Sequence, residues 1–344
     1  MTQLGHVKIT KSDFNLFREA PRHLWAKKHG RIEQPLSEFI QHLSEDGYAV
    51  ERLAMEYFNA LYLPRHPGVE LRAQQTFSDG PFEARVDVLL FDRADGSYSL
   101  YEIKSSNEPN KDHLYDLAFQ AAIVLAALPV TRFFLMHLNK EYIRGGELDL
   151  AQLLCADDVT DDVLALLPEI ASLRAEALHA AQQSDPNLLG FCLAPRDCPC
   201  PGVCHPDLPE FSIYDIPFLG KPKKMELIEQ GIRAARDIPD GFGLNAKQWL
   251  VVERARTNNE HLDRARLKAE LGGLRFPLWF LDYETCISAV PLFDGYHSQQ
   301  QVVFQYSLQR LDQPGDEALP GGYLSLGAGD PAGGLLERLS AELG

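Results

Sequence analysis

The sequence has no apolar run long enough to span a membrane, and no apolar segment near its start of the kind that directs secretion. Positive charge is scarce, with 33 lysines and arginines against 49 aspartates and glutamates and a formal net charge of −16. Broad electrostatic adhesion to nucleic acid is therefore disfavoured. We expect a cytoplasmic protein with no membrane partner. Its six cysteines should be free or metal-bound rather than paired in disulfides.

The little positive charge there is gathers at the N-terminus. Residues 1–32 hold seven basic side chains and two acidic ones, which makes this the one basic region able to bind phosphate. A set within it is predicted to bind nucleic acid: Lys11, Arg18, Arg22 and Lys27. The alternative is a solvated helix face with no ligand.

The pattern of apolar residues predicts a mixed α/β protein without internal repeats or low-complexity tracts. Helices are predicted over 10–28 (with Ser12 as N-cap), 36–62 (with a break near Asp46-Gly47), 112–127, 161–183 and within 223–272, and at the end of the chain. Strands are predicted over 69–77, 84–92, 99–106, 132–138, 277–285 and 302–311. Proline and cysteine are dense from 187 to 222, which indicates an irregular, stapled segment.

Two neighbouring strands carry a chemically unusual set of residues. Asp87 lies inside the apolar run 84–92, and Glu102 and Lys104 lie two apart on the next strand, so that they share a face. Two carboxylates converging in an apolar setting are costly unless a cation neutralises them. Mg²⁺ or Mn²⁺ prefers such oxygen ligands, and Lys104 could then position water or stabilise charge on a phosphate. The alternative without a catalytic role is an ion pair between Glu102 and Lys104 at the surface.

In order and content these motifs resemble those of RecB-like PD-(D/E)xK nucleases over about the first 220 residues. The matching segments are G-Y-A-V-E-R-L-A, A-R-V-D-V-L-L, Y-E-I-K-S-S and D-L-A-F-Q. The resemblance implies a restriction-endonuclease-like mixed sheet flanked by helices. It makes Glu51, Asp87, Glu102 and the carbonyl of Ile103 metal ligands, Lys104 the catalytic lysine and Gln120 an orienting residue. Val124 stands where the family often has tyrosine.

Four cysteines fall within thirteen residues: Cys192, Cys198, Cys200 and Cys204. Thiolates this dense in a reducing compartment indicate a metal site, either an iron–sulfur cluster or zinc. Many RecB-like nucleases hold a [4Fe–4S] cluster with one cysteine before the nuclease core and three after it, but the early position here is Ala20. We expect Cys200 or His205 to supply the fourth ligand, with Zn²⁺ as the alternative to the cluster. The alternative is a site that has lost its metal and holds reduced cysteines.

A second acidic motif, F-L-D-Y-E-T, places Asp282 and Glu284 at the end of an apolar strand. It resembles the first motif of RNase H-like (DEDD-type) exonucleases, whose two metals need about four carboxylates. A structural ion pair at a strand end would look the same. Nearly the whole chain resembles a bacterial family that joins the two domain types. Measured against that family, the second domain is expected to be truncated at Gly344 and inactive as given.

These observations predict four regions: a nuclease domain over 1–190, a cysteine-rich metal segment over 191–220, a helical connector over 221–274, and the start of an RNase H-like α/β domain over 275–344. The expected function is metal-dependent hydrolysis of phosphodiester bonds in DNA, with single strands or ends favoured over duplexes, and RNA as a further substrate. One alternative is a nucleic-acid-binding module whose site does not turn over. The other is an exonuclease that requires the complete C-terminal domain.

Overall fold

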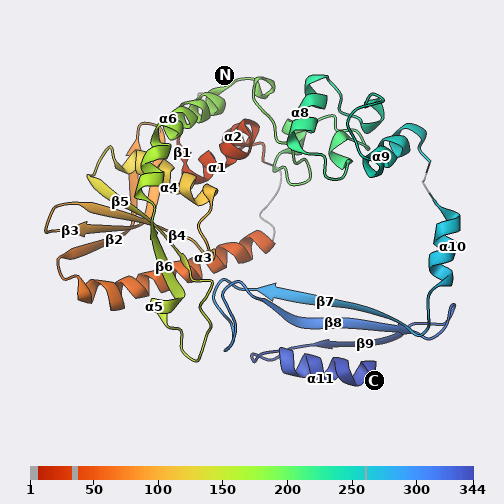
Figure 1. Cartoon of the computed structure of the whole chain (residues 1–344). Coiled ribbons are helices and arrows are strands. Elements are labelled where there is room, and N and C mark those ends of the chain that lie inside the picture. Colours follow the sequence, from red (N-terminus) through yellow and green to blue (C-terminus); the bar gives the residue numbers. More distant parts are fainter. Residues whose placement is uncertain (1–6, 33–37, 260–261) are drawn as a thin grey trace. The chain divides into compact units, whose positions relative to one another are not determined.

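The computed structural model describes residues 7–32, 38–259 and 262–344, and the chain divides into two compact units (Figure 1). Unit 1 comprises residues 1–35 and 172–269, and unit 2 comprises residues 36–171 and 270–344. Helix α6 (Thr160–Gln182) and helix α10 (Arg264–Gly272) cross from one unit to the other. Among the described residues, no helix combines the length and the apolar character that a membrane crossing requires.

Unit 2 contains a mixed sheet, which confirms the α/β class. Strand β2 pairs antiparallel with β3, β3 antiparallel with β4, β4 parallel with β5, and β5 antiparallel with β6. The bounds are β2 Val69–Asp79, β3 Phe82–Asp92, β4 Tyr98–Ile103, β5 Val130–Leu138 and β6 Leu154–Asp158, with the short helix α5 (Leu150–Leu153) before β6. Helix α4 (Lys111–Val124) makes the crossover between the parallel strands β4 and β5, as parallel pairing requires.

Helices cover both faces of this sheet (Figure 1). Successive strand residues point to opposite faces, so Val88 and Tyr101 meet helix α3 (Glu38–Tyr57) on one face. Helix α4 packs against β3 and β5 on the other. The predicted break near Asp46-Gly47 is wrong, because α3 runs through it. An interior glycine costs a helix only about 1 kcal/mol, and burial of the apolar face of α3 outweighs that cost. The predicted start at residue 36 lies outside the described residues.

The last part of unit 2 is a three-stranded antiparallel sheet. Its order is β7 (Leu278–Ile287), β8 (Gln301–Leu311) and β9 (Leu319–Leu324), and helix α11 (Ala332–Leu343) packs on β8 and β9. Strand β9 was not predicted, because its Pro320-Gly321-Gly322 stretch has low strand propensity. An edge strand tolerates such residues.

In unit 1, the predicted helix over 10–28 is two helices, α1 (Lys11–Glu19) and α2 (Pro21–Lys28). Pro21 forces the extended conformation on Ala20 and starts the second helix, where its missing N–H is not needed. Thr10, rather than Ser12, caps α1, in a capping box with Asp13. The remaining elements are strand β1 (Ile9–Thr10) and helices α7 (Pro201–Cys204), α8 (Lys221–Glu229) and α9 (Ala246–Thr257), joined by single 3-10 turns.

Candidate functional site

The structure brings Asp87 and Glu102 face to face on adjacent strands. Val88 pairs with Tyr101, so one step further along the register Asp87 stands opposite Glu102, on the face covered by α4. Asp87 Oδ2 accepts a hydrogen bond of 2.9 Å from the N–H of Ile103, which fixes the carboxylate against β4. Glu102 is 1% exposed. A buried carboxylate requires compensation by a cation or by hydrogen bonds.

That compensation comes from Lys104 and from helix α4. Lys104 Nζ lies 2.9 Å from Glu102 Oε1 and also pairs with Asp116 of α4. Gln120, one helical turn after Asp116, donates from Nε2 to Glu102 Oε2 at 2.5 Å. Asp87, Glu102, Lys104 and Gln120 therefore lie in one polar cluster, called the carboxylate–lysine centre below. Asp116 completes it.

The charge state of the centre follows from its burial. Burial alone would lower the pKa of Lys104, but the carboxylates of Glu102 and Asp116 outweigh it and raise that pKa above its usual range. Lys104 is therefore a cation at neutral pH. Burial and the positive charge of Lys104 lower the pKa of His113, at the start of α4, so this imidazole is neutral there. The positive charge is thus concentrated at the lysine beside the strand end.

Glu51 reaches the sheet from α3 through an intermediate residue. Its Oε1 accepts a short hydrogen bond from Gln74 of β2, and Gln74 stands opposite Asp87 between the pairs Ala73–Val88 and Gln75–Val86. Gln74 has φ of +54°, a left-handed conformation that is costly for a residue other than glycine and is often found at functional sites. No sequence signal marked Gln74.

The oxygen atoms of this centre are of the type that a hard divalent cation binds. It offers carboxylate oxygens, and the buried Oε1 atoms of Gln74 and Gln120 have no hydrogen-bond partner, so both are available to an ion or its water. Among the residues that the structure describes, however, the carboxylates of Glu51, Asp87 and Glu102 do not converge within 4.8 Å, unlike the cysteine group below. Binding of one ion by all three carboxylates therefore requires their side chains to move closer together.

The connection between β7 and β8 packs beside the centre. Gln299 Nε2 donates to the carbonyl of Ser105 at 2.6 Å, and Asn107 Nδ2 donates to the carbonyl of Ser298 at 3.1 Å. These bonds hold the segment that follows Lys104. The only signal for this in the sequence was the polar run before β8.

Asp116 has a position-holding role that can be tested. Replacing it with asparagine keeps its size but removes one of the two negative charges on Lys104. The resemblance to PD-(D/E)xK nucleases predicts metal-dependent cleavage, and in this variant we expect that activity to fall about 10-fold, as for outer-shell partners of metal sites. The pKa of Lys104 should also fall, so any alkaline limb in the pH profile should move to lower pH. Rates of Asp116→Asn and of the exposed-site control Glu147→Gln between about pH 8 and pH 12, the range in which a lysine loses its proton, would measure this. An unmoved profile would assign Asp116 a purely structural role.

The cysteines of unit 1 gather around His23 of helix α2. The imidazole of His23 and the thiols of Cys192, Cys198 and Cys204 place their ligand atoms within 4.8 Å of one another, and all four residues are buried. The structure can therefore hold a metal ion here. Cys200 lies beside this group, with Sγ 3.8 Å from Cys204 Sγ. His205 Nε2 lies 3.2 Å from Cys192 Sγ. Sequence reasoning missed His23, which follows Ala20 by three residues.

The His23 imidazole and the cysteine thiols shift one another's pKa values. Hydrogen bonds from Cys192, Cys198 and Cys200 lower the pKa of Cys204 far below its usual range. Burial lowers the pKa of His23, but contacts with Cys192, Cys204 and Glu19 outweigh burial and raise that pKa to about 11. A thiolate beside an imidazolium is the arrangement that a metal cation replaces, because metal binding releases protons.

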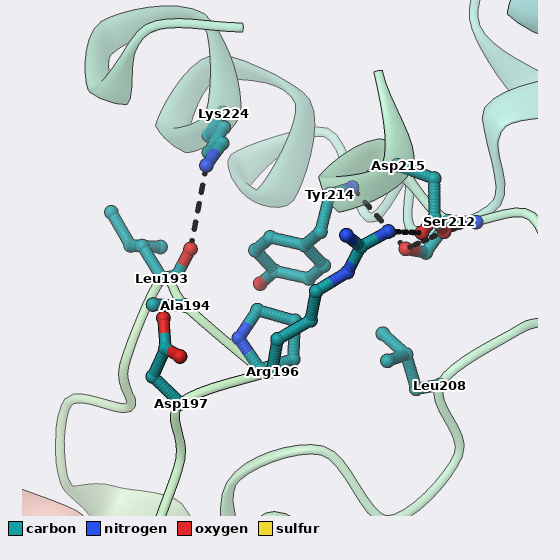
Figure 2. Close-up of a pocket in the computed structure, with 10 residues that line it drawn as sticks. Leu193, Ala194, Arg196, Asp197, Leu208, Ser212, Tyr214, Asp215 and Lys224 are labelled. Carbon is teal, nitrogen blue, oxygen red and sulfur yellow. Dashed lines mark hydrogen bonds and ion pairs between the residues drawn. The ribbon is translucent and has the colours of Figure 1, made fainter. Parts of the chain in front are cut away.

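The loop between Cys192 and Cys198 is held by unit 1 itself (Figure 2). Lys224 of α8 donates to the carbonyl of Leu193 at 3.4 Å, and Arg196 pairs with Asp215 at 3.3 Å. The Tyr214 ring lies below Lys224 Nζ, in a pocket of about 230 Å³ lined by this loop. These contacts pack the loop that carries the cysteines against the rest of unit 1.

The predicted phosphate-binding set divides in the structure. Arg22 is 8% exposed, and its guanidinium donates to the carbonyls of Asn187, Leu189 and Val203, so it secures α2 to the cysteine segment instead of facing solvent. Lys27 pairs with the buried Asp13 at 2.8 Å. Lys11 and Arg18 are partly exposed, and each has a further interaction within the chain.

Asp282 and Glu284 lie on β7, the edge strand of the small sheet, and both are exposed. They pair with Ser307 and Gln305 of β8 and so share a face. Within the described ranges, no third acidic, cysteine or histidine side chain joins them in a close group.

Comparison with known proteins leaves most of the chain unassigned. Residues 279–344 match the model of a family described as "Domain of unknown function (DUF2779)". No curated protein matches the sequence. A solved structure described as "Crystal structure of SSO0001" is similar, with a TM-score of 0.34 and 11% identity over 60% of this chain and 89% of that chain. A likeness of that size does not assign a fold.

Proposed function

We propose that this protein is a metal-dependent nuclease whose active site is the carboxylate–lysine centre. The observation that carries the proposal is the pairing of Lys104 with Glu102, at 2.9 Å, directly opposite Asp87 on the next strand. A fully structural ion pair in a core is more easily replaced by apolar side chains, so a buried lysine with two carboxylates suggests chemistry. The same residues carry the resemblance to RecB-like PD-(D/E)xK nucleases.

Each residue has a distinct role in this proposal. Asp87, Glu102 and the carbonyl of Ile103 would hold Mg²⁺ or Mn²⁺, and Glu51 would complete the site from α3. The bound ion would lower the pKa of a water molecule and offset charge on the scissile phosphate. Lys104 would orient the attacking water or stabilise the developing negative charge.

Gln120 would act through Glu102. Its side-chain amide already donates to Glu102 Oε2, which leaves the other carboxylate oxygen for Lys104 or for the ion. Burial of Gln120, which is 0% exposed, keeps the amide in one orientation. An oriented carboxylate binds a cation with less loss of conformational entropy.

The proposed substrate is DNA, with single strands or frayed ends favoured and RNA as the other polymer of the same chemistry. A net charge of −16 makes wide contact with a duplex backbone unfavourable, so binding should depend on a few local cations. With Arg22 buried, Lys11, Arg18 and Lys27 remain the proposed phosphate contacts.

The order of strands supports a restriction-endonuclease-like core. Three antiparallel strands, β2 to β4, are followed by a crossover helix and a parallel strand, β5, and the centre lies where β3 and β4 diverge. For residues 275–344 we propose an RNase H-like beginning. The exposed pair Asp282 and Glu284 is not assigned a separate reaction.

The proposal is tested by incubating the purified chain with end-labelled single-stranded DNA, duplex DNA and RNA, in Mg²⁺, in Mn²⁺ and in EDTA. We expect cleavage of DNA that requires the divalent ion and is faster on single strands. Retention of DNA in a metal-independent complex, with no cleavage under any of these conditions, would favour a binding module instead.

A further inference from the structure

The cysteine group in unit 1 was expected to hold a four-iron cluster. The distances between its ligand atoms differ from those that such a cluster requires. The four cysteines of a cubane bind four different iron atoms, so their sulfurs stand well apart. Ligands of one tetrahedral zinc ion, with bonds of 2.0–2.3 Å, lie about 3.5 to 3.8 Å from one another. Here all four ligand atoms lie within 4.8 Å, and Cys198 Sγ is 3.5 Å from His23 Nε2. The residues do not fit a four-iron cluster.

We propose that His23, Cys192, Cys198 and Cys204 bind a single tetrahedral metal ion, zinc, and that His23 is the ligand in place of the expected early cysteine. Three thiolates and one imidazole form a known structural zinc set. All four residues are buried and come from two segments of unit 1 that are 175 residues apart at Cys198 and His23. No solvent position remains open, so the site is structural.

The orientation of His23 supports its role as a ligand. Nδ1 lies 3.2 Å from a carboxylate oxygen of Glu19, the last residue of α1, and this leaves Nε2 directed at the sulfurs. A histidine that binds a metal through one nitrogen typically donates from the other to a carboxylate or carbonyl. Glu19 therefore fixes the tautomer that zinc binding requires.

Helix α2 is positioned for this role by contacts that need no metal. Pro21 begins the helix, and the N–H of Arg22 donates to the carbonyl of Gly190. The guanidinium of Arg22 binds three further carbonyls of residues 187–203. His23, the next residue, therefore lies against the cysteine segment. The two segments of unit 1 are therefore linked through His23, although Ala20 occupies the position where the resemblance implies a cysteine.

Cys200 and His205 are the competing ligands. Cys200 Sγ lies 3.8 Å from Cys204 Sγ and also contacts the Cys198 thiol, and His205 Nε2 lies 3.2 Å from Cys192 Sγ. Neither belongs to the compact group of four. We assign Cys200 to the packing around the site and His205 to the surroundings of Cys192.

The test is the metal content of the anaerobically purified full chain, measured for zinc, iron and acid-labile sulfide. We expect about one zinc per chain and no sulfide. Iron with sulfide near four of each per chain, or a protein without any metal, would overturn the proposal. None of these measurements depends on nuclease activity. Failure of the proposed nuclease function would therefore leave the zinc proposal standing.

Variants identify the fourth ligand. We expect His23→Ala to lose most of its zinc, and Cys200→Ser and His205→Ala to keep it. If His23→Ala fails to fold, His23→Cys decides the question, because a four-cysteine set should retain the ion. In the Co²⁺-substituted form, His23→Cys should then show stronger thiolate-to-metal absorption than the wild type. Zinc loss in Cys200→Ser together with full zinc in His23→Ala would overturn the assignment of His23.

Discussion

Replacing Lys104 with alanine is expected to lower the rate of metal-dependent cleavage by about 1,000-fold, the scale found when one preorganised charge-stabilising group is removed. The physical reason is that Lys104 is the only side chain of the centre that brings positive charge to the strand end. Single-turnover cleavage of labelled single-stranded DNA would measure the loss. Lys111→Ala provides the matched control, since Lys111 is an exposed lysine of the adjacent helix α4.

The alanine variant also leaves two buried carboxylates without their cation, which typically destabilises a protein by about 3 to 5 kcal/mol. Lys104→Arg separates the two effects. Arginine keeps the charge beside Glu102 and Asp116, so the fold should be retained, but its planar fork cannot replace a compact ammonium. We expect a strong loss of cleavage in Lys104→Arg with a melting temperature near that of the wild type. Cleavage by Lys104→Arg at the rate of the wild type would show that any cation at this position is sufficient.

Removal of the metal from unit 1 is expected to destabilise that unit by several kcal/mol. Structural zinc contributes on the order of 10–16 kcal/mol of binding free energy in small zinc domains, and most of it is folding free energy. Cys198→Ser should therefore lose the ion and increase hydrogen exchange in α2 and in residues 192–204. Strands β2 to β5 should keep their protection, because they belong to unit 2.

Cys155→Ser is the matched control for this experiment, since Cys155 lies on β6 in unit 2, outside the cysteine group. It should leave both metal content and exchange unchanged. Equal protection of α2 in the wild type and in Cys198→Ser would contradict a stabilising role for the ion.

The core strands could be predicted from the sequence because the spacing of apolar residues within each strand indicates which of them are buried. The prediction of the strand that contains Asp87 and of the strand that contains Glu102 required only the local pattern of apolar residues. Strand β3 follows its prediction within two residues, whereas β4 ends at Ile103 instead of residue 106, so Lys104 lies just after the strand. Alternation also predicted that Glu102 and Lys104 share a face.

Other parts depend on contacts that no local pattern records. His23 comes near the cysteines only because α2 folds against residues 187–203, far away in the sequence. Arg22 looked like a phosphate contact, since its three carbonyl partners cannot be recognised before folding. Asp116 could have been found from its spacing of four residues before Gln120, which places both on one helix face. Strand β6, which contains Cys155, was not predicted, and its pairing with β5 at His137 overrides the weak local preference.

The most direct measurement of the central claim is single-turnover cleavage of labelled single-stranded DNA in Mg²⁺ or Mn²⁺ by the wild type, Asp87→Ala and the exposed-carboxylate control Glu147→Gln. We predict cleavage by the wild type and the control that EDTA abolishes, and loss of about three orders of magnitude in Asp87→Ala. Undiminished metal-dependent cleavage by Asp87→Ala and by Lys104→Ala would contradict the assignment of the active site to the carboxylate–lysine centre.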